Sequence, residues 1–537
     1  MTISEKYYPN FFNDVYGPVM QAGSSSHTAA PCRIGYMAKS VLGEDVARID
    51  VFLDKDGSFA GTFGVMQEDL GMLSGAYGLL PDDVRLFSIK QILDQEGIVY
   101  QFHFSVLKES KHINAMKFVL TGVSGKIISL VGNSVGGGMI EIVCVNGYPC
   151  ATCGDAYVLL AEYDDKELPK EDQTILHSSL QGLLQYDVTQ GESGKWLHCF
   201  YTSAENELST LRNKLQAQNI SVIRPVLPVV SNGKRKKQLF TTFTEWAKLC
   251  EEQKKSLSDI AIQYQMDASG WSEVEVVSYM RYIAEKMYGQ THDVFEKDAI
   301  VLETPFSGFH YAGWSKYIHT KETFLGPIMA NAIKYAYAAI TSVYGVQIVP
   351  GPMGTGGGIL YSVLCAAKET GKYNDEDLLR GLFVAAGVGA IAYTRTNPTG
   401  EIIGCAGECG VCSAMAAAGV TQMRGGTPQE VEAAASMSLQ ATLGWPCDPI
   451  PGGDNQPCAS RVVAAVVMAI TFSDVALSGK TAVLPLHEVM DAADRIGRAM
   501  PQELRCTSKG GCCDTTTGQK CIKLFQAWRA DEAVGAQ

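Results

Sequence analysis

The pattern of apolar and polar positions divides the chain into a strand-rich first part and a helical second part. Up to residue 155, short apolar runs such as RIDVFLD, KIISLVGNSV and IEIVCV predict strands, and the glycines at 136–138 predict a turn between the last two. Residues 156–232 alternate strand and helix patterns. We expect a strand in YVLLAEY, a helix over QTILHSSLQGLL, a strand in KWLHCFY, a helix over ENELSTLRNKLQAQ and a strand in ISVIRPVL.

The apolar positions recur at helical spacing from about residue 240 onward. The main segments are FTEWAKLCEEQKKSLSDIAIQYQM, EVEVVSYMRYIAEKMY, MANAIKYAYAAITSVY, VEAAASMSLQATLG and ASRVVAAVVMAIT, and their small residues predict closely packed, mostly buried helices. The order of elements over 156–232 is loosely similar to an ACT regulatory module. We therefore expect an α+β protein with an N-terminal α/β small domain (1–155), an ACT-like α+β unit (156–232) and a large, mainly α-helical domain (240–525).

Composition narrows the class of protein. The chain has 537 residues, 46% of them hydrophobic and 19% charged, and a net charge of −13. An acidic surface argues against nucleic acid or an anionic membrane as the main partner. No secretory signal is visible, and the longest apolar candidate, LFVAAGVGAIAY, is too short to span a membrane. We expect a cytoplasmic protein, whose 16 cysteines then serve metal binding, catalysis or burial rather than disulfides.

Three cysteines crowd into GCAGECGVCSAMAAAG at Cys405, Cys409 and Cys412. Their C-x3-C-x2-C spacing matches the cluster tripod of radical-SAM enzymes, but too little chain follows for the barrel that such enzymes need. A CGVC redox or zinc pair would need a second pair or a βαβ context. A longer set fits better: Cys405, Cys447 and Cys458 each lie in a glycine- or proline-bounded loop at a helix end. Cys409 and Cys412 are then expected to be buried small hydrophobes.

Three thiolates suggest a particular chemistry. They can hold a [4Fe–4S] cluster while leaving one iron open as a Lewis acid for a substrate carboxylate and hydroxyl. That arrangement suits a dehydration, in which hydroxide leaves while a base removes the α-proton.

Several motifs together resemble the iron–sulfur L-serine dehydratase (L-serine ammonia-lyase) family. These are GSSSHTAAPCRIG, NSVGGGMIEIVCVNG, GCAGECGVCSAMAAAG and CDPIPGGDNQPC. The resemblance implies that the family's small and large domains are fused in one chain. It also implies a [4Fe–4S] cofactor, no pyridoxal phosphate, and a lyase of amino-acid metabolism and gluconeogenesis.

The resemblance assigns roles to particular residues. The three cluster ligands fall on Cys405, Cys447 and Cys458, and His27 falls on the acid/base position. The neighbouring substrate-binding positions are Ser24, Ser25, Ser26 and Thr28. The loop VPGPMGTGGG departs from the family's loop, but the backbone amides around Gly354, Thr355 and Gly356 could still receive a carboxylate. The family's cysteine tail corresponds to CTSKGGCCDTTTGQKC, where Cys521 is the nearest match for a fourth ligand; a second metal site or a mobile, redox-sensitive tail are the alternatives.

The chain also departs from the family pattern. Met66 stands where the family has a catalytic histidine, and Ala406 replaces a glutamine after the first cluster cysteine. The family's substrate loop is replaced by PFSGFHYAG, whose His310 could compensate for the lost histidine. These changes put the substrate in question.

Three functions remain open from the sequence. The first is a homodimeric dehydratase that converts L-serine to pyruvate and ammonia. The second keeps the cluster but acts on L-threonine, another β-hydroxy acid, or L-cysteine with loss of sulfide. The third is a non-catalytic iron or redox sensor on the same scaffold.

Overall fold

The computed structural model describes residues 8–64, 66–206, 211–233, 237–296, 311–340, 345–351, 356–450 and 457–535. The chain divides into two compact units, which we describe separately. Unit 1 comprises residues 1–25 and 236–537, and unit 2 comprises residues 26–235. The expected combination of an N-terminal sheet region and a helical C-terminal region is confirmed.

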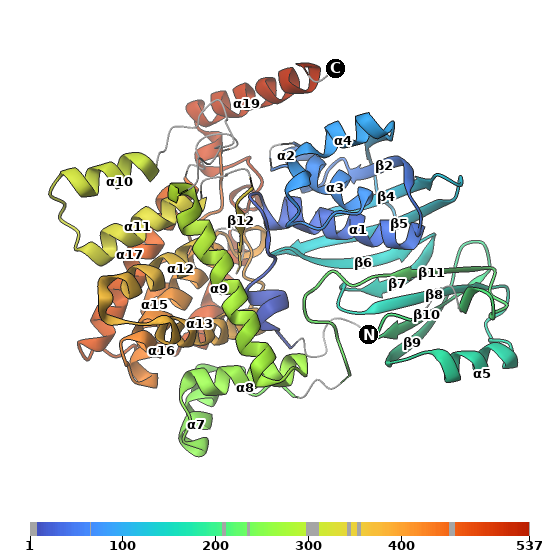
Figure 1. The fold of residues 1–537 in the computed structure, drawn as a ribbon. Helices are drawn as coiled ribbons and strands as arrows, with labels where there is room; N and C mark the ends of the chain where they lie inside the picture. The colour runs from blue at the N-terminus through green and yellow to red at the C-terminus, as the bar shows by residue number, and fades with distance from the viewer. Residues whose placement is uncertain are drawn as a thin grey trace. The chain divides into compact units, whose positions relative to one another are not determined.

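Unit 2 is built on a six-stranded sheet with the order β3-β2-β4-β5-β6-β7 (Figure 1). Its strands are β2 (Val46–Asp54), β3 (Val99–Ser105), β4 (Ala115–Gly122), β5 (Ile127–Gly136), β6 (Met139–Val145) and β7 (Tyr148–Thr152). All neighbouring strands are antiparallel except β2 and β3. Helix α1 (Ala30–Leu42) packs against β4, β5 and β6. Its fully buried Ile34 joins Ile49, Phe118 and Leu130 from the sheet in one hydrophobic core.

Three further helices of unit 2 are α2 (Ser58–Thr62), α3 (Glu68–Tyr77) and α4 (Ile89–Glu96). Glycines bring the backbone of α3 against the start of α1. A Cβ on Gly71 would lie 2.2 Å from the carbonyl oxygen of Thr28, and one on Gly75 would lie 1.9 Å from that of Cys32. Any larger residue would push the two backbones apart, so these glycines let Thr28 and Cys32 lie against α3.

The second sheet of unit 2 has the order β11-β8-β10-β9, and all its pairs are antiparallel. Its elements are β8 (Tyr157–Tyr163), α5 (Lys170–Ser179), β9 (Leu183–Gln190), β10 (Trp196–Thr202) and β11 (Asn219–Ile223). The three predicted strands are present. The predicted helix over residues 173–184 is too long, because α5 ends at Ser179 and Gly182, with φ +65°, leads into β9. β9 is an edge strand with exposed side chains, so its sequence lacks an apolar signal.

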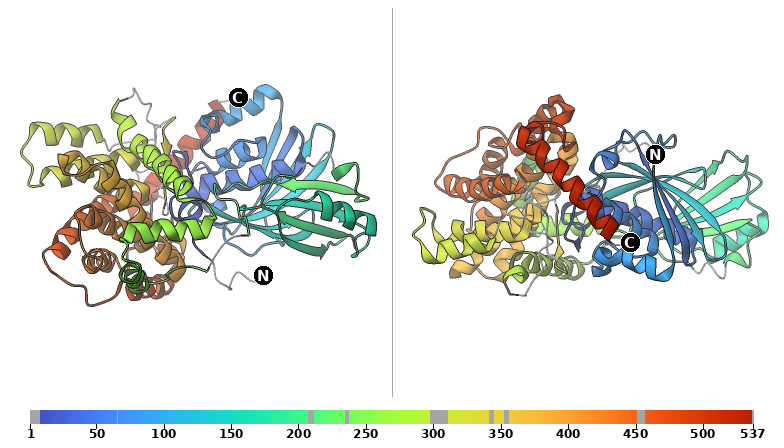
Figure 2. Two further views of the ribbon diagram at one scale, coloured as in Figure 1. Left: turned by 60° about the horizontal axis from the view of Figure 1, so that its bottom comes forward. Right: turned by 90° about the horizontal axis from the view of Figure 1, so that it is seen from above.

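Unit 1 is mainly helical, and two further views show its helices from other sides (Figure 2). The helices are α7 (Phe243–Gln253), α8 (Leu257–Ser269), α9 (Glu273–Glu296), α10 (Tyr311–Thr320), α11 (Pro327–Ile340), α12 (Gly356–Ala367), α13 (Asp375–Arg395), α14 (Gly400–Ile403), α15 (Val411–Met423), α16 (Pro428–Gln440), α17 (Cys458–Leu477), α18 (Leu486–Ala499) and α19 (Thr516–Gly535). The alanine-rich α15 lies at the centre, packed by α12, α13, α16 and α17. Gly381 and Gly419 let α13 and α15 approach closely, since a Cβ on Gly419 would lie 2.9 Å from the Gly381 carbonyl oxygen.

The single helix predicted over residues 243–266 is two helices. Lys254 takes a left-handed conformation with φ +53° and ends α7, and the Ser256 side chain caps α8 by accepting a hydrogen bond from the Asp259 amide. A two-stranded sheet also joins β1 (Met20–Gln21) to β12 (Gln347–Ile348), which places the N-terminal segment within the helical unit.

Two helices, α13 and α17, are long and apolar enough to cross a membrane by length and composition. The sequence expectation concerned uninterrupted apolar runs, whereas this criterion accepts a window with up to two charged residues. The apolar window of α13 is 78% buried, as in a core helix, whereas that of α17 is 33% buried. Length and composition alone are weak evidence for a membrane span.

Candidate metal centre and active site

The first cysteine of the candidate metal centre is fixed by a glycine. Gly404 has φ +66° and ψ −162°, a conformation that only glycine adopts readily, and a Cβ there would lie 2.4 Å from the Trp445 carbonyl oxygen. The Cys405 amide donates a hydrogen bond to that same oxygen at 2.9 Å. The loop before α15 and the loop after α16 are therefore joined at the position of Cys405.

The structure brings several sulfur atoms together at this point. The Cys405 Sγ lies 3.4 Å from the Cys409 Sγ, and the Cys405 thiol also hydrogen-bonds to Cys447. Gly400 makes room for Cys447, since a Cβ on it would lie 2.8 Å from the Cys447 Sγ. Cys458, half-buried at the start of α17, lies close enough to interact electrostatically with Cys405.

Cys409 is buried, as expected, but its Sγ also contacts the Cys405 Sγ, a contact that the sequence analysis did not predict. The turn from Ala406 to Gly410 is a π-helix, and it holds Cys409 over Cys405. π-Helical turns often occur at functional sites. Cys412 is fully buried in α15, as predicted.

The charges around the thiols differ from one cysteine to the next. Hydrogen bonds from Cys409 and Cys447, together with the nearby Arg461 guanidinium, hold the pKa of Cys405 well below its usual range. Burial raises the pKa of Cys458, and burial beside Cys405 raises the pKa of Glu408. Cys405 is thus the thiol most ready to act as a thiolate ligand.

Arg461 forms an ion pair with the buried Asp448. Its Nη1 lies 2.6 Å from the Asp448 Oδ1, and the Asp448 side chain is only 2% exposed. The sequence analysis did not identify Arg461 or Glu408. Arg461 lies three residues after Cys458, and Glu408 lies three residues after Cys405. This spacing from the cysteines of the motifs was the available signal.

The cysteine tail returns to the same site through its first cysteine rather than through Cys521. The Cys447 amide donates to the Leu504 carbonyl at 2.8 Å, and the Cys506 amide donates to the Cys447 carbonyl at 2.7 Å. The Cys506 and Cys447 thiols also hydrogen-bond to each other. Cys521 lies half-buried on α19, and among the described residues we find no hydrogen bond that links it to the other cysteines.

The rest of the tail is anchored to the loop after Cys447. The Asp448 Oδ2 accepts a hydrogen bond from the Cys512 amide at 2.6 Å, and the Cys513 thiol donates to the Pro449 carbonyl at 3.0 Å. Residues 502–514 are therefore packed onto the cysteine site.

His27 lies in unit 2, in the π-helix Ser25–Ala29 that leads into α1. It is fully buried, with its Nδ1 2.9 Å from the Ser26 Oγ and its Nε2 3.2 Å from the Ser58 Oγ. The Phe59 ring meets the imidazole edge-on at 5.2 Å. These contacts fix the ring between two hydroxyl groups, each of which can donate or accept a hydrogen bond.

Thr28 and Met66 connect this segment to the position of the missing family histidine. The Thr28 hydroxyl donates to the Met66 carbonyl at 2.5 Å, and the Met66 amide donates to the Glu68 carboxylate at 3.0 Å. Burial raises the pKa of Glu68 to about 8. Glu68 is a buried, titratable group that the sequence analysis missed, because a glutamate at the start of a helix ordinarily serves the helix dipole.

The other predicted site residues have different outcomes. Ser24 and Ser25 belong to unit 1, whereas His27 belongs to unit 2. Ser25 is buried. His310, Gly354 and Thr355 lie outside the described residues, and Gly356 begins α12. His310 and the glycine-rich loop therefore stay predictions.

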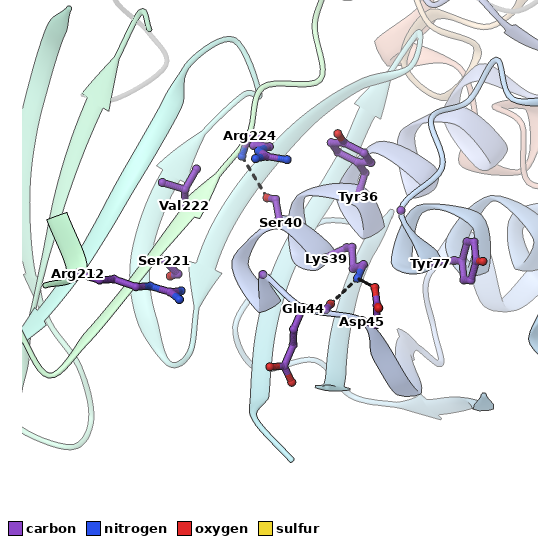
Figure 3. A pocket seen from close by; sticks show the side chains of 12 residues that line it. Tyr36, Lys39, Ser40, Glu44, Asp45, Tyr77, Arg212, Ser221, Val222 and Arg224 are labelled. Carbon is purple, nitrogen blue, oxygen red and sulfur yellow. Dashed lines mark hydrogen bonds and ion pairs between the residues drawn. The ribbon is translucent and has the colours of Figure 1, made fainter. Parts of the chain in front are cut away.

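A pocket of about 520 Å³ lies in unit 2 beside α1 and β11 (Figure 3). Its cations already have partners: the Arg224 guanidinium pairs with Glu205 at 2.8 Å, and the Lys39 Nζ lies 3.4 Å from Asp45. The Arg212 guanidinium donates to the Ile220 carbonyl at 3.0 Å. This pocket contains none of the predicted site residues.

The fold and these residues define a protein that carries a cysteine-lined candidate metal centre on a helical unit. A family model described as "Serine dehydratase alpha chain" matches residues 246–513. The chain is 29% identical to the probable L-serine dehydratase alpha chain of Bacillus subtilis over 53% of this chain and 95% of that protein. It is 33% identical to the probable alpha chain of Latilactobacillus sakei over 36% of this chain and 92% of that protein.

A further relative is the L-serine dehydratase beta chain of Peptoniphilus asaccharolyticus, which is 33% identical over 28% of this chain and 68% of that protein. The chain is thus similar to both the alpha and the beta chains of these enzymes. It belongs to the L-serine dehydratase family, and it is a lyase.

Proposed function

We propose that this protein is an iron–sulfur L-serine dehydratase that converts L-serine to pyruvate and ammonia. The observation that supports the proposal is that the Cys405 thiol hydrogen-bonds to Cys447 and lies close enough to Cys458 to interact with it electrostatically. The membership of the chain in the L-serine dehydratase family supports the substrate and the reaction.

The donor set fits a [4Fe–4S] cluster. Cys405, Cys447 and Cys458 would hold it, since thiolates are the usual protein ligands of such clusters. The lowered pKa of Cys405 and the positive charge of Arg461 favour the ligating form of that thiol. When bound, the cluster supplies a Lewis-acidic iron that polarises the substrate carboxylate and the leaving hydroxyl. We keep Cys521 as the proposed fourth ligand in the family pattern; Cys506 is the tail cysteine whose thiol hydrogen-bonds to Cys447.

His27 would move the proton in this reaction. Its Nε2 would accept the α-proton of serine, while its Nδ1 contact with Ser26 keeps the ring oriented. Ser24, Ser25, Ser26 and Thr28 would bind the substrate beside it. Loss of the α-proton and the β-hydroxyl gives aminoacrylate, which hydrolyses to pyruvate and ammonia. No pyridoxal phosphate is required.

The test is 2-oxo acid release from L-serine by full-length protein reconstituted without oxygen. Pyruvate formation that is lost on exposure to air supports the proposal. The variant Cys458→Ala should lose iron and turnover together, whereas Cys250→Ser, which replaces a buried cysteine of α7, should keep both. Iron-loaded protein that forms no pyruvate would refute the proposal.

His27→Ala tests the proposed acid/base role independently of iron binding. It should keep the iron content of the unsubstituted protein, because His27 belongs to unit 2 and is not one of the proposed iron ligands. It should lose turnover, because the proposed proton acceptor is removed. Unchanged turnover would remove His27 from the mechanism.

One observation favours an alternative substrate. Met66 stands near His27 and Thr28 in place of a histidine, and its neighbour Glu68 is buried. This changed position supports L-threonine or L-cysteine as an alternative substrate. A panel of L-serine, L-threonine and L-cysteine under the same anaerobic conditions decides between them.

The ACT-like assignment of residues 156–232 gains support from topology. The strands β8, β9, β10 and β11 follow the order 4-1-3-2 of a ferredoxin-like sheet, with α5 after the first strand. The domain boundaries 1–155, 156–232 and 240–525 remain our proposal, and we propose a homodimer in the cytoplasm that needs no nucleic acid or membrane. Size-exclusion chromatography with light scattering tests the oligomeric state.

A further inference from the structure

A second group of potential metal ligands lies in unit 1, away from the cysteine loops. His292 comes from α9, Cys365 comes from α12, and Glu369 comes from the π-helix Lys368–Lys372 that continues α12. One ligand atom of each residue lies within 4.8 Å of the others. No role in the proposed dehydration uses these residues.

The separations between the ligand atoms suit one small metal ion. The His292 Nε2 lies 3.0 Å from the Glu369 Oε1, and the Cys365 Sγ lies 3.6 Å from the same oxygen. A tetrahedral zinc ion with ordinary bond lengths places its sulfur and oxygen ligands about 3.6 Å apart and its nitrogen and oxygen ligands about 3.4 Å apart. The three atoms therefore need only small shifts to share one ion.

His292 has polar neighbours at both ring nitrogens, and its Nε2 faces the Glu369 carboxylate. Its Nδ1 lies 2.7 Å from the Thr291 Oγ1 and 3.2 Å from the Tyr288 carbonyl oxygen. The Thr291 hydroxyl donates to the Met287 or Tyr288 carbonyl, and in that arrangement both neighbours of Nδ1 accept a hydrogen bond and Nδ1 carries the proton. The Tyr288 ring stacks on the imidazole at 4.0 Å and Tyr335 packs near it at 4.5 Å. In metal sites, a ligating histidine usually donates its second nitrogen to such a carbonyl.

With the proton on Nδ1, Nε2 and the Glu369 carboxylate present two lone pairs to each other. Either a second proton or a metal ion must lie between them. The Tyr335 hydroxyl hydrogen-bonds to the other oxygen of Glu369 and orients the carboxylate. His292 is 8% exposed, whereas Glu369 is exposed, so an ion could enter from the solvent side.

We propose that His292, Cys365 and Glu369 form a divalent metal site of the zinc class, with a fourth position open to water. A donor set of one nitrogen, one sulfur and one oxygen suits Zn²⁺ and its spectroscopic substitute Co²⁺ better than Mg²⁺ or Ca²⁺, which prefer oxygen. Binding requires the Cys365 thiol to lose its proton, so the affinity rises with pH. The site would fasten α9 to α12.

The direct test uses full-length, iron-loaded protein dialysed against buffered Zn²⁺, with zinc and iron measured on the same sample. We expect one zinc per chain beyond the iron, with an X-ray absorption spectrum showing a single sulfur ligand among nitrogen and oxygen ligands. Absence of zinc overturns the proposal. A sulfur-rich zinc spectrum also overturns it, because it would place the zinc at the centre formed by Cys405, Cys447 and Cys458.

Variants test the assignment of each ligand. Cys365→Ser should lose the near-ultraviolet thiolate band of the Co²⁺-loaded protein, and His292→Gln should lose the bound ion, whereas the matched control Cys250→Ser keeps both. Tyr335→Phe should weaken the binding of Zn²⁺ by about 10-fold, through the freed Glu369 carboxylate. Equal zinc content in Cys365→Ser and the unsubstituted protein contradicts the proposal. Iron content and pyruvate formation report separately on the proposed function.

Discussion

The glycine before Cys405 provides a direct test of how the cysteine centre is built. We predict that Gly404→Ala destabilises the protein and lowers its iron content. Gly404 has φ +66° and ψ −162°, and its new Cβ would lie 2.4 Å from the Trp445 carbonyl oxygen. That oxygen already accepts the hydrogen bond from the Cys405 amide. The substitution therefore disturbs the contact that positions the first cysteine.

The magnitude follows from two separate effects. Holding a residue with a Cβ in this backbone region costs about 1–3 kcal/mol. Forcing a methyl group against a packed carbonyl costs about a further 1–3 kcal/mol. We expect a loss of about 2–6 kcal/mol in total, the sum of the backbone and contact costs.

Gly425→Ala is the matched control. Gly425 also has a positive φ, of +78°, but its added Cβ would meet nothing within 4 Å. Only the backbone cost of about 1–2 kcal/mol then applies. Urea denaturation without oxygen, together with iron per chain, compares the two variants. Equal stability and equal iron content in both would show that the contact with Trp445 does not position Cys405.

Three further predictions test other parts of the structure. Asp448→Asn should cost about 3–5 kcal/mol by leaving the Arg461 charge unpaired in a buried setting, whereas Asp474→Asn should cost under about 1 kcal/mol, because the Asp474 side chain is 64% exposed and that of its partner Arg424 is 31% exposed; urea denaturation measures both. Burial raises the pKa of Glu68 to about 8 from 4.5, so the stability it contributes is present below pH 4.5 and is lost as the pH rises through 8. Glu68→Gln should therefore gain in thermal midpoint relative to the unsubstituted protein between pH 5 and pH 8, and a constant difference would contradict the raised pKa. Asn374→Ala should lower stability by about 1 kcal/mol, seen as a lower urea midpoint, because the Asn374 side chain caps α13.

The strands and helices that the sequence predicted well are those with strong local signals. RIDVFLD alternates buried and half-exposed side chains in β2, and YVLLAEY is β8 from its first residue to its last. The edge strand β9, LLQYDVTQ, mixes apolar and polar residues and has no fully buried side chain, so its position depends on pairing with β10 more than on its own sequence. The break after α7 depends on one left-handed residue, Lys254, which apolar periodicity does not reveal.

The sequence predicts those residues of the candidate site whose positions depend on neighbouring residues in the chain. Cys405, Cys447 and Cys458 stand out because glycine and proline mark the loops that carry them. Cys506 does not, because its place beside Cys447 depends on hydrogen bonds between residues far apart in the chain. Cys409 was separated from Cys405 in the sequence argument, although a π-helical turn brings the two sulfurs to 3.4 Å.

The two ligand groups of the helical unit are built in different ways, and this difference governs how each responds to change. The cysteine centre gathers loop ends, so its geometry depends on Gly404, on Gly400 and on the tail that returns to Cys447. The group of His292, Cys365 and Glu369 is carried by helix α9 and by α12 with its π-helical extension, whose packing holds it in place. Disturbing the tail should therefore affect iron and leave zinc in place, because no described hydrogen bond joins the tail to the second group. Disturbing the contact of α9 with α12 should release zinc and leave iron in place. Iron content and zinc content therefore report independently on two parts of one helical unit.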